Sequence, residues 1–207
     1  MTCPKKPYIL KPGTVFVSLV GSEGRYDNIV ELLKETVEDW GRKLQRVQLD
    51  NAQLGGIDLS GANLKEANLS MADLKGALLI GADLQGASLL SADLVKAWIC
   101  RTDLRDANLS SADLSGAYIL ETELKGAILK GTDLRGADLS DADLHRVRGL
   151  TTEMLLKVFT LYGVKGLAPK IEAELRAKKP RLFEKPDFWM VQKEWDLLFK
   201  AQEALKR

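Results

Sequence analysis

The chain has little of the chemistry on which most enzymes depend. Its 207 residues include one histidine, His145, and two cysteines, Cys3 and Cys100. A single histidine excludes multi-histidine metal sites, and we expect no histidine-based triad because His145 falls in an outward slot of the repeat described below. Two cysteines so far apart form neither a metal-binding spacing nor a disulfide framework, so we expect both to be reduced thiols.

Long apolar runs and an excess of charge are also missing. The longest apolar run near the N-terminus, residues 14–20, is far shorter than the roughly 18 to 20 residues of a membrane span, and no cleavage site follows it. We predict a strand there. The net charge is +1, so bulk charge does not indicate nucleic-acid binding. We therefore expect a cytoplasmic protein with no membrane contact and no direct nucleic-acid contact.

What the chain does contain is a period of five. Leu or Ile stands at every fifth position from Leu49 to Leu144, twenty times without a gap, and fifteen of the positions two residues earlier are Ala. A five-residue step drifts around a helix and alternates faces on a strand, so neither element could bury these residues on one side. The chain must turn once in each pentad and send every Leu and Ala inward.

Glycine supports this interpretation. It fills nine of the twenty positions that lie two residues after the Leu or Ile, as expected where a turn needs positive φ. They are Gly56, Gly61, Gly76, Gly81, Gly86, Gly116, Gly126, Gly131 and Gly136.

This pattern resembles the A(D/N)LXX motif of the pentapeptide repeat proteins, over residues 47–146. The resemblance implies an all-β solenoid, a right-handed quadrilateral β-helix with four pentads in each coil and Leu and Ala in its core. Twenty pentads then make about five coils, a rod roughly 24 Å long at about 4.8 Å per coil.

If residues 20 apart stack, each side of the rod can be read as a column. One side carries apolar or amphipathic residues in the outward slots of its three middle coils, between polar first and last coils, which is typical of an interface. These residues are Leu78, Ile80, Trp98, Cys100, Tyr118 and Leu120. They could be covered by the protein's own flanks, meet a second copy, or bind a partner.

Two other sides carry acidic columns. The first contains Asp73, Asp93, Asp113 and Asp133, and the second contains Asp83, Asp103, Glu123 and Asp143. The fourth side is predicted to be a polar wall, with Leu90 and Ile128 as isolated exceptions.

The flanks have helical patterns. Residues 1–46 predict a strand and an amphipathic helix that caps the first coil. Residues 147–207 predict about three helices: one beginning behind Thr151 or Thr152 and ending at Gly163, one from Pro169 to Lys179, and one over 187–206. The last bears an apolar stripe of Phe188, Val191, Trp195, Leu198 and Phe199.

These patterns predict a non-catalytic scaffold that presents a rigid rod with an apolar face to a protein partner, with no cofactor and no metal. The acidic residues follow the repeat, as on a solvated face, and no phosphate-binding motif is present. Two alternatives remain open. The resemblance extends to quinolone-resistance members, whose acidic rods mimic DNA and inhibit DNA gyrase or topoisomerase; a structural homodimer could instead use the apolar face symmetrically.

Overall fold

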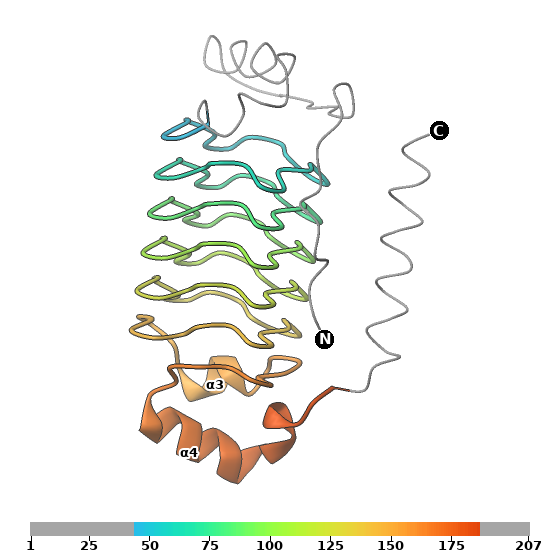
Figure 1. Ribbon diagram of the computed structural model, residues 1–207, viewed down its shortest axis with the longest axis vertical. Helices are drawn as coiled ribbons and strands as arrows, with labels where there is room; N and C mark the ends of the chain where they lie inside the picture. Colours follow the sequence, from blue (N-terminus) through green and yellow to red (C-terminus); the bar gives the residue numbers. More distant parts are fainter. Residues whose placement is uncertain (1–43, 187–207) are drawn as a thin grey trace, which may run out of the picture.

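A computed structural model describes residues 44–186, and in it the chain winds into a four-sided rod (Figure 1). Residues 20 positions apart pair by parallel β-bridges on every side. In the first coil the pairs are 48–68, 53–73, 58–78 and 63–83. Each side of a coil forms a single β-bridge to the next coil and no long strand. The predicted stacking of pentads is therefore present, although the strands are very short.

The pentad pattern provides a partner for each of its five backbone N–H groups. In residues 72–76, the N–H of Ala72 closes a turn on the carbonyl of Leu69, and the next two N–H groups and the last bond to neighbouring coils. The remaining N–H, that of Lys75, donates to Oδ1 of Asp73 at 3.1 Å. Buried backbone N–H groups need such partners. The motif has Asp or Asn before the Leu because its side-chain oxygen accepts the one N–H that the coils leave unpaired.

Each pentad ends in a turn whose third residue has positive φ. The nine repeat glycines all have it, for example Gly76 at +62°, which confirms the predicted turn. Residues with side chains occupy the same slot elsewhere, including Asn51 at +61° and Met71 at +60°. The turn therefore tolerates other residues, at a cost of about 1–2 kcal/mol each in this conformation.

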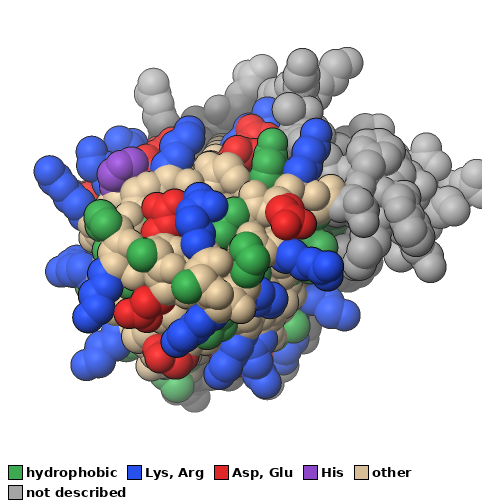
Figure 2. Space-filling model, turned by 90° about the horizontal axis from the view of Figure 1, so that it is seen from below, with side chains coloured by type: hydrophobic (Ala, Val, Ile, Leu, Met, Phe, Trp, Pro, Cys, Tyr) green, Lys and Arg blue, Asp and Glu red, His purple; other side chains and the backbone are tan. Residues whose placement is uncertain are grey.

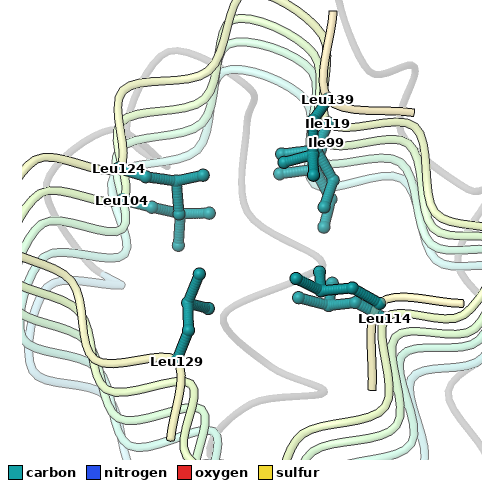
Figure 3. A pocket seen from close by; sticks show the side chains of 8 residues that line it. Ile99, Leu104, Leu114, Ile119, Leu124, Leu129 and Leu139 are labelled. Carbon is teal, nitrogen blue, oxygen red and sulfur yellow. The ribbon is translucent and has the colours of Figure 1, made fainter. Parts of the chain in front are cut away.

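The Leu, Ile and Ala side chains fill the axis of the rod. Leu64, Leu84 and Leu109 are fully buried. Figure 3 looks along the axis and shows Leu and Ile side chains from all four sides pointing toward one another. The space between the eight that line it does not admit a water molecule, so the axis is a packed core and not a channel.

The rod extends beyond the predicted boundaries. Leu44 joins the core before the first complete pentad. After residue 146, Arg148 pairs with Ile128, 20 residues back, but Thr160 pairs with Asp138, 22 residues back. A sixth coil with two extra residues therefore follows the five regular ones.

The extra residues belong to a short helix, α3 (Thr152–Leu155), which replaces one side of this coil. The side chain of Thr151 accepts a hydrogen bond from the Met154 N–H, so the predicted start is correct. The predicted end at Gly163 is wrong: beyond α3 the chain rejoins the rod, where the Phe159 N–H donates to Ala137 O at 2.9 Å. The apolar spacing there reflects burial of Val158 and Leu161 in the core, not a longer helix.

Helix α4 (Pro169–Lys178) and the 3₁₀ helix η2 (Pro180–Phe183) close the end of the rod (Figure 1). The helix predicted from Pro169 to Lys179 is α4, one residue shorter. Leu175 and Leu182 enter the core, and the Leu161 N–H donates to Leu182 O at 2.6 Å. This closure shields both the apolar core and the open backbone of the last coil. The capping helix predicted in residues 1–46, the strand before it and the helix predicted over 187–206 lie outside the described residues.

Candidate functional site: the outer sides of the rod

The structure brings the predicted apolar residues together in one column, which we call the apolar column. Its members are Leu78, Ile80, Trp98, Cys100, Tyr118 and Leu120. Trp98 forms bridges with Leu78 and Tyr118, and the rings of Trp98 and Tyr118 stack with centroids 4.3 Å apart and planes 25° apart. The column is a second hydrophobic cluster, separate from the core of the rod.

Although these side chains occupy outward slots, most of the apolar column is buried. Trp98 is 7% exposed, Ile80 5% and Cys100 0%, while Tyr118 is half-buried. Cys100 lies outside any disulfide. That the apolar column is an interface stays a prediction.

The acidic columns also form as predicted, with Asp73, Asp93, Asp113 and Asp133 on one side and Asp83, Asp103, Glu123 and Asp143 on another. Their aspartates accept backbone N–H bonds within their own pentads, as Asp113 does from Ser115 at 2.8 Å. Asp58, Asn68 and nine other repeat residues of the Asp or Asn type make the same contact. The acidic columns thus follow from the turn chemistry of the repeat.

Neighbouring cations offset part of this charge. Lys75 Nζ lies 2.8 Å from Asp93 Oδ2 in the next coil, and Lys65 Nζ lies 3.2 Å from Asp83 Oδ2. The hydrogen bond to Asp93, followed by the charges of Asp93 and Asp73, raises the pKa of Lys75. Asp103 and Asp133 pair with Arg105 and Arg135. With the two lysine pairs, four of the eight column carboxylates therefore pair with a Lys or Arg.

The arginine pairs lower the pKa of their aspartates. For Asp133 the hydrogen bond from Arg135 lowers the pKa more than partial burial raises it. For Asp103 burial is the largest influence and raises the pKa, but the hydrogen bonds and charge of Arg105 together outweigh it. Both carboxylates therefore stay ionised in the folded protein at neutral pH.

The single histidine is engaged with the repeat. His145 Nδ1 lies 2.6 Å from Asp143 Oδ1, and the His145 backbone N–H donates to the same oxygen at 2.9 Å. No group of three or more His, Cys, Asp or Glu side chains within residues 44–186 is placed to hold a metal ion.

The side opposite the apolar column is the one predicted to be a polar wall. Its outward slots carry no charge in the second, third and fourth coils, whereas Asp50 in the first coil and Lys130 in the fifth are charged. We call this side the neutral face, and its uncharged residues are Gln48, Asn68, Ser70, Ser88, Leu90, Asn108, Ser110 and Ile128. Hydrogen bonds join its coils, from Asn68 Nδ2 to Gln48 Oε1 at 3.1 Å and between the Ser70 and Ser88 hydroxyls at 2.8 Å.

The edge of the neutral face holds two exposed apolar side chains. Met71 is 62% exposed and Leu90 is 41% exposed, and the Met71 N–H donates to Leu90 O at 2.8 Å, so they lie on adjacent coils. Leu90 is one of the two isolated exceptions predicted for this side, whereas Met71 was not predicted because it falls in the turn slot. Met71 could have been found from the sequence as a large apolar residue at a turn position that favours Gly.

The closed end of the rod differs from its sides in charge. Residues 147–186 contain nine basic and four acidic residues, whereas residues 47–146 contain nine basic and fifteen acidic ones. Figure 2 looks onto this end and shows Lys and Arg side chains around it, with apolar side chains between them. The predicted stripe of Phe188, Val191, Trp195, Leu198 and Phe199 lies outside the described residues.

The coils, the turn slots and the filled core define a solenoid built from five-residue units. The family model for pentapeptide repeats matches residues 43–79, 72–106 and 107–146, in eight copies. The chain belongs to the pentapeptide repeat family. Members of this family fold as right-handed quadrilateral β-helices and are generally non-catalytic structural or interaction modules.

Several solved structures are similar to the chain. A pentapeptide repeat protein from the Arabidopsis thaliana thylakoid lumen is 32% identical, with a TM-score of 0.49, over 53% of this chain and 72% of that one. Rfr23 from the cyanobacterium Cyanothece 51142 is 31% identical, with a TM-score of 0.41, over 50% of this chain and 66% of that one. QnrB1, a plasmid-mediated fluoroquinolone resistance protein, is 20% identical, with a TM-score of 0.38, over 70% and 77%.

No curated protein matches the chain. In the part of the chain that the structure describes, no helix has the length and apolar character needed to cross a membrane.

Proposed function

We propose that the protein is a non-catalytic scaffold whose rod binds a protein partner through the neutral face. The observation that carries the proposal is the contrast between the sides of the rod. The apolar column is buried, two sides carry acidic columns, and the neutral face alone combines uncharged outward slots with exposed apolar side chains, Met71 and Leu90.

The chemistry of the neutral face suits a protein partner. The centres of protein interfaces are depleted in charged residues and enriched in Met. Uncharged Asn and Ser side chains lose less hydration free energy on burial than carboxylates do. The backbone ladder also holds the face rigid, so binding requires little ordering.

The DNA-mimic alternative gains no support from the acidic columns. A mimic of duplex DNA needs an uncompensated row of negative charge. Here Lys65, Lys75, Arg105 and Arg135 each pair with a column carboxylate, and the aspartates also accept backbone hydrogen bonds. The homodimer alternative requires the apolar column to be accessible, and most of that column is buried.

The test is affinity capture from a native extract with three forms of the full chain. They are the wild type, the double variant Met71→Glu/Leu90→Glu, and the double variant Gln85→Glu/Ser115→Glu, which adds the same charge to the acidic sides. We expect proteins retained by the wild type to be lost with the first variant and kept with the second. Equal recovery by all three forms would exclude the neutral face as the binding surface.

A further inference from the structure

The charge of the chain is separated along the rod. Residues 47–146 contain nine basic and fifteen acidic residues, a net charge of −6, whereas residues 147–186 contain nine basic and four acidic residues, a net charge of +5. All nine basic side chains of this second segment are exposed. Residues 187–207 add no net charge, with four acidic and four basic residues. The closed end is therefore a cationic surface on a rod whose sides are acidic.

Few contacts within the protein neutralise this end. Glu172 Oε1 lies 2.8 Å from Arg176 Nη2, and Glu174 accepts a hydrogen bond from the Thr152 hydroxyl at 2.8 Å, so two of the four carboxylates are engaged. Arg176 is the only one of the nine cations that forms an ion pair within residues 44–186. The fifth coil, residues 127–146, has three basic and four acidic residues, so the cationic surplus begins beyond it.

Helix α4 lies across this end and presents part of the charge. Leu175 is fully buried in the core, which fixes the side of α4 that faces the rod. Lys170, Ala173 and Ala177 fall on the opposite side, since successive helical residues turn by about 100°, and all three are exposed. Lys178, in the last turn, is exposed as well. Because the alanine side chains are short, Lys170 and Lys178 can reach a flat surface that lies against α4.

The residue types at the closed end suit a lipid surface better than a nucleic acid. Residues 147–186 contain six Lys, three Arg and no Asn or Gln, so the side-chain amides that read adenine in a duplex are missing. Phe159, in the sixth coil, is 41% exposed, and Figure 2 shows apolar side chains between the cations. Cations beside exposed apolar side chains are typical of proteins that lie on a membrane without crossing it.

Binding of this kind needs no membrane span. The expectation of no membrane contact rests on the shortness of the apolar runs, and that criterion concerns crossing alone. At an anionic surface each Lys or Arg that comes close adds to the attraction, which decays over a Debye length of about 10 Å at 0.1 M salt. The same surface repels the acidic columns, so the end of the rod approaches it rather than the sides.

We propose that the closed end, residues 147–186, binds a lipid surface that carries anionic headgroups, with Lys170 and Lys178 of α4 among the contacting residues. The rod then stands on this surface with its axis directed away from it. The proposal concerns the end of the rod and not its sides, so it does not depend on the partner proposed for the neutral face.

The test is co-sedimentation of the full chain, at about 0.1 M salt, with vesicles of phosphatidylcholine that contain about one-third phosphatidylserine. We expect the wild type to bind these vesicles, to dissociate as salt is raised, and not to bind vesicles of phosphatidylcholine alone. Lys170→Glu/Lys178→Glu should weaken binding by roughly tenfold or more, because each charge near the surface contributes. Lys96→Glu/Lys125→Glu makes the same change in net charge at exposed positions on the sides of the rod, and binding should stay within about twofold.

Circular dichroism would establish that each variant retains the rod. Lys170→Gln/Lys178→Gln provides a milder change, with a smaller loss of binding in the same direction. Unchanged binding by Lys170→Glu/Lys178→Glu would overturn the proposal, and so would an equal loss with the variant on the sides, since net charge alone would then explain binding. Binding to phosphatidylcholine alone would also overturn it. So would tighter binding to a DNA duplex than to the vesicles at the same salt, which would identify a nucleic acid as the ligand of this end.

Discussion

Thr102 Oγ1 donates a hydrogen bond of 2.6 Å to the carbonyl oxygen of Leu79, in the preceding coil. Thr102 occupies an inward slot where most pentads have Ala, and it is fully buried. Thr122 and Thr132 repeat the contact with the carbonyls of Ile99 and Leu109. A hydroxyl can thus replace a methyl in the core because the coil below offers an acceptor.

Replacing this hydroxyl should weaken the fold modestly. Thr102→Val keeps the shape but removes the donor, and we expect a loss of about 0.5–1.5 kcal/mol in the free energy of unfolding, measured in urea. The loss stays small because the Leu79 carbonyl also accepts from the Ala82 N–H at 3.1 Å. Thr102→Ser is the control, and a larger loss for Ser than for Val would contradict this explanation.

The stacked leucines should dominate stability. Leu84→Ala empties a fully buried position, and we expect a loss of about 2–5 kcal/mol in the free energy of unfolding. Leu90→Ala makes the same chemical change at a 41% exposed position and should alter stability by less than about 0.5 kcal/mol. Equal losses in chemical denaturation would mean that the coil does not hold Leu84 at its axis.

Glycines with positive φ should differ in how replaceable they are. At Gly76 a Cβ would meet nothing within 4 Å, whereas at Gly166 it would lie 2.4 Å from the backbone nitrogen of His145. Gly76→Ala should cost about 1–2 kcal/mol from the turn conformation alone. Gly166→Ala should lower the melting temperature more, because the backbone of the last coil must move. Equal shifts would show that close approach is unimportant at Gly166.

The ion pair of Asp133 and Arg135 should make a small contribution that depends on pH. The pKa of Asp133 is lowered below its ordinary value of 3.8, so the pair stabilises the fold above about pH 4, and this stabilisation is lost as the pH falls through the lower folded value. The side chains are 31% and 66% exposed, so solvent screening keeps this contribution small.

Urea unfolding of Arg135→Gln would measure this contribution. The variant should be less stable than the wild type at pH 7, and the difference should shrink as the pH falls below about 4. Lys130→Gln removes an exposed cation and serves as the control. A deficit that stays the same at every pH would show that Arg135 acts through packing.

The closed end should keep rods from stacking on one another. Leu175→Asp places a charge in the fully buried position that anchors α4, and we expect α4 to detach and expose the last coil. Light scattering should then detect end-to-end association. Ala177→Asp, on the exposed side of α4, should remain like the wild type; association of both variants would point to a general loss of solubility.

The repeat could be predicted from the sequence because each pentad satisfies its own physical requirements. The Leu spacing, the glycines with positive φ and the columns of residues 20 apart all follow from local pattern, and the structure contains them. The end of the rod could not be predicted in the same way. Val158 and Leu161 have a helical spacing with Met154, yet tertiary pairing with the fifth coil overrides it.

The state of the outer sides was also beyond sequence patterns. Trp98 and Leu90 are both apolar residues in outward slots, and nothing local distinguishes them. Their burial, 7% against 41% exposed, depends on what lies outside the coil. The columns could be assigned from spacing, but whether a column is open depends on contacts distant in sequence.

The sixth coil, with its two extra residues, constrains how this protein can change in length. A duplicated block of twenty residues would add one level and leave every Leu, Asp and Gly over its counterpart. An insertion of five, ten or fifteen residues would move every later column to another side of the rod, and an insertion that is not a multiple of five would turn outward-facing residues, many of them charged, toward the axis. Residues 149–157 accommodate two extra residues because α3 follows the last regular coil. No further regular coil has to stack on this one. Descendants of this rod can therefore lengthen in whole coils, and each step would move its two ends apart by about 4.8 Å.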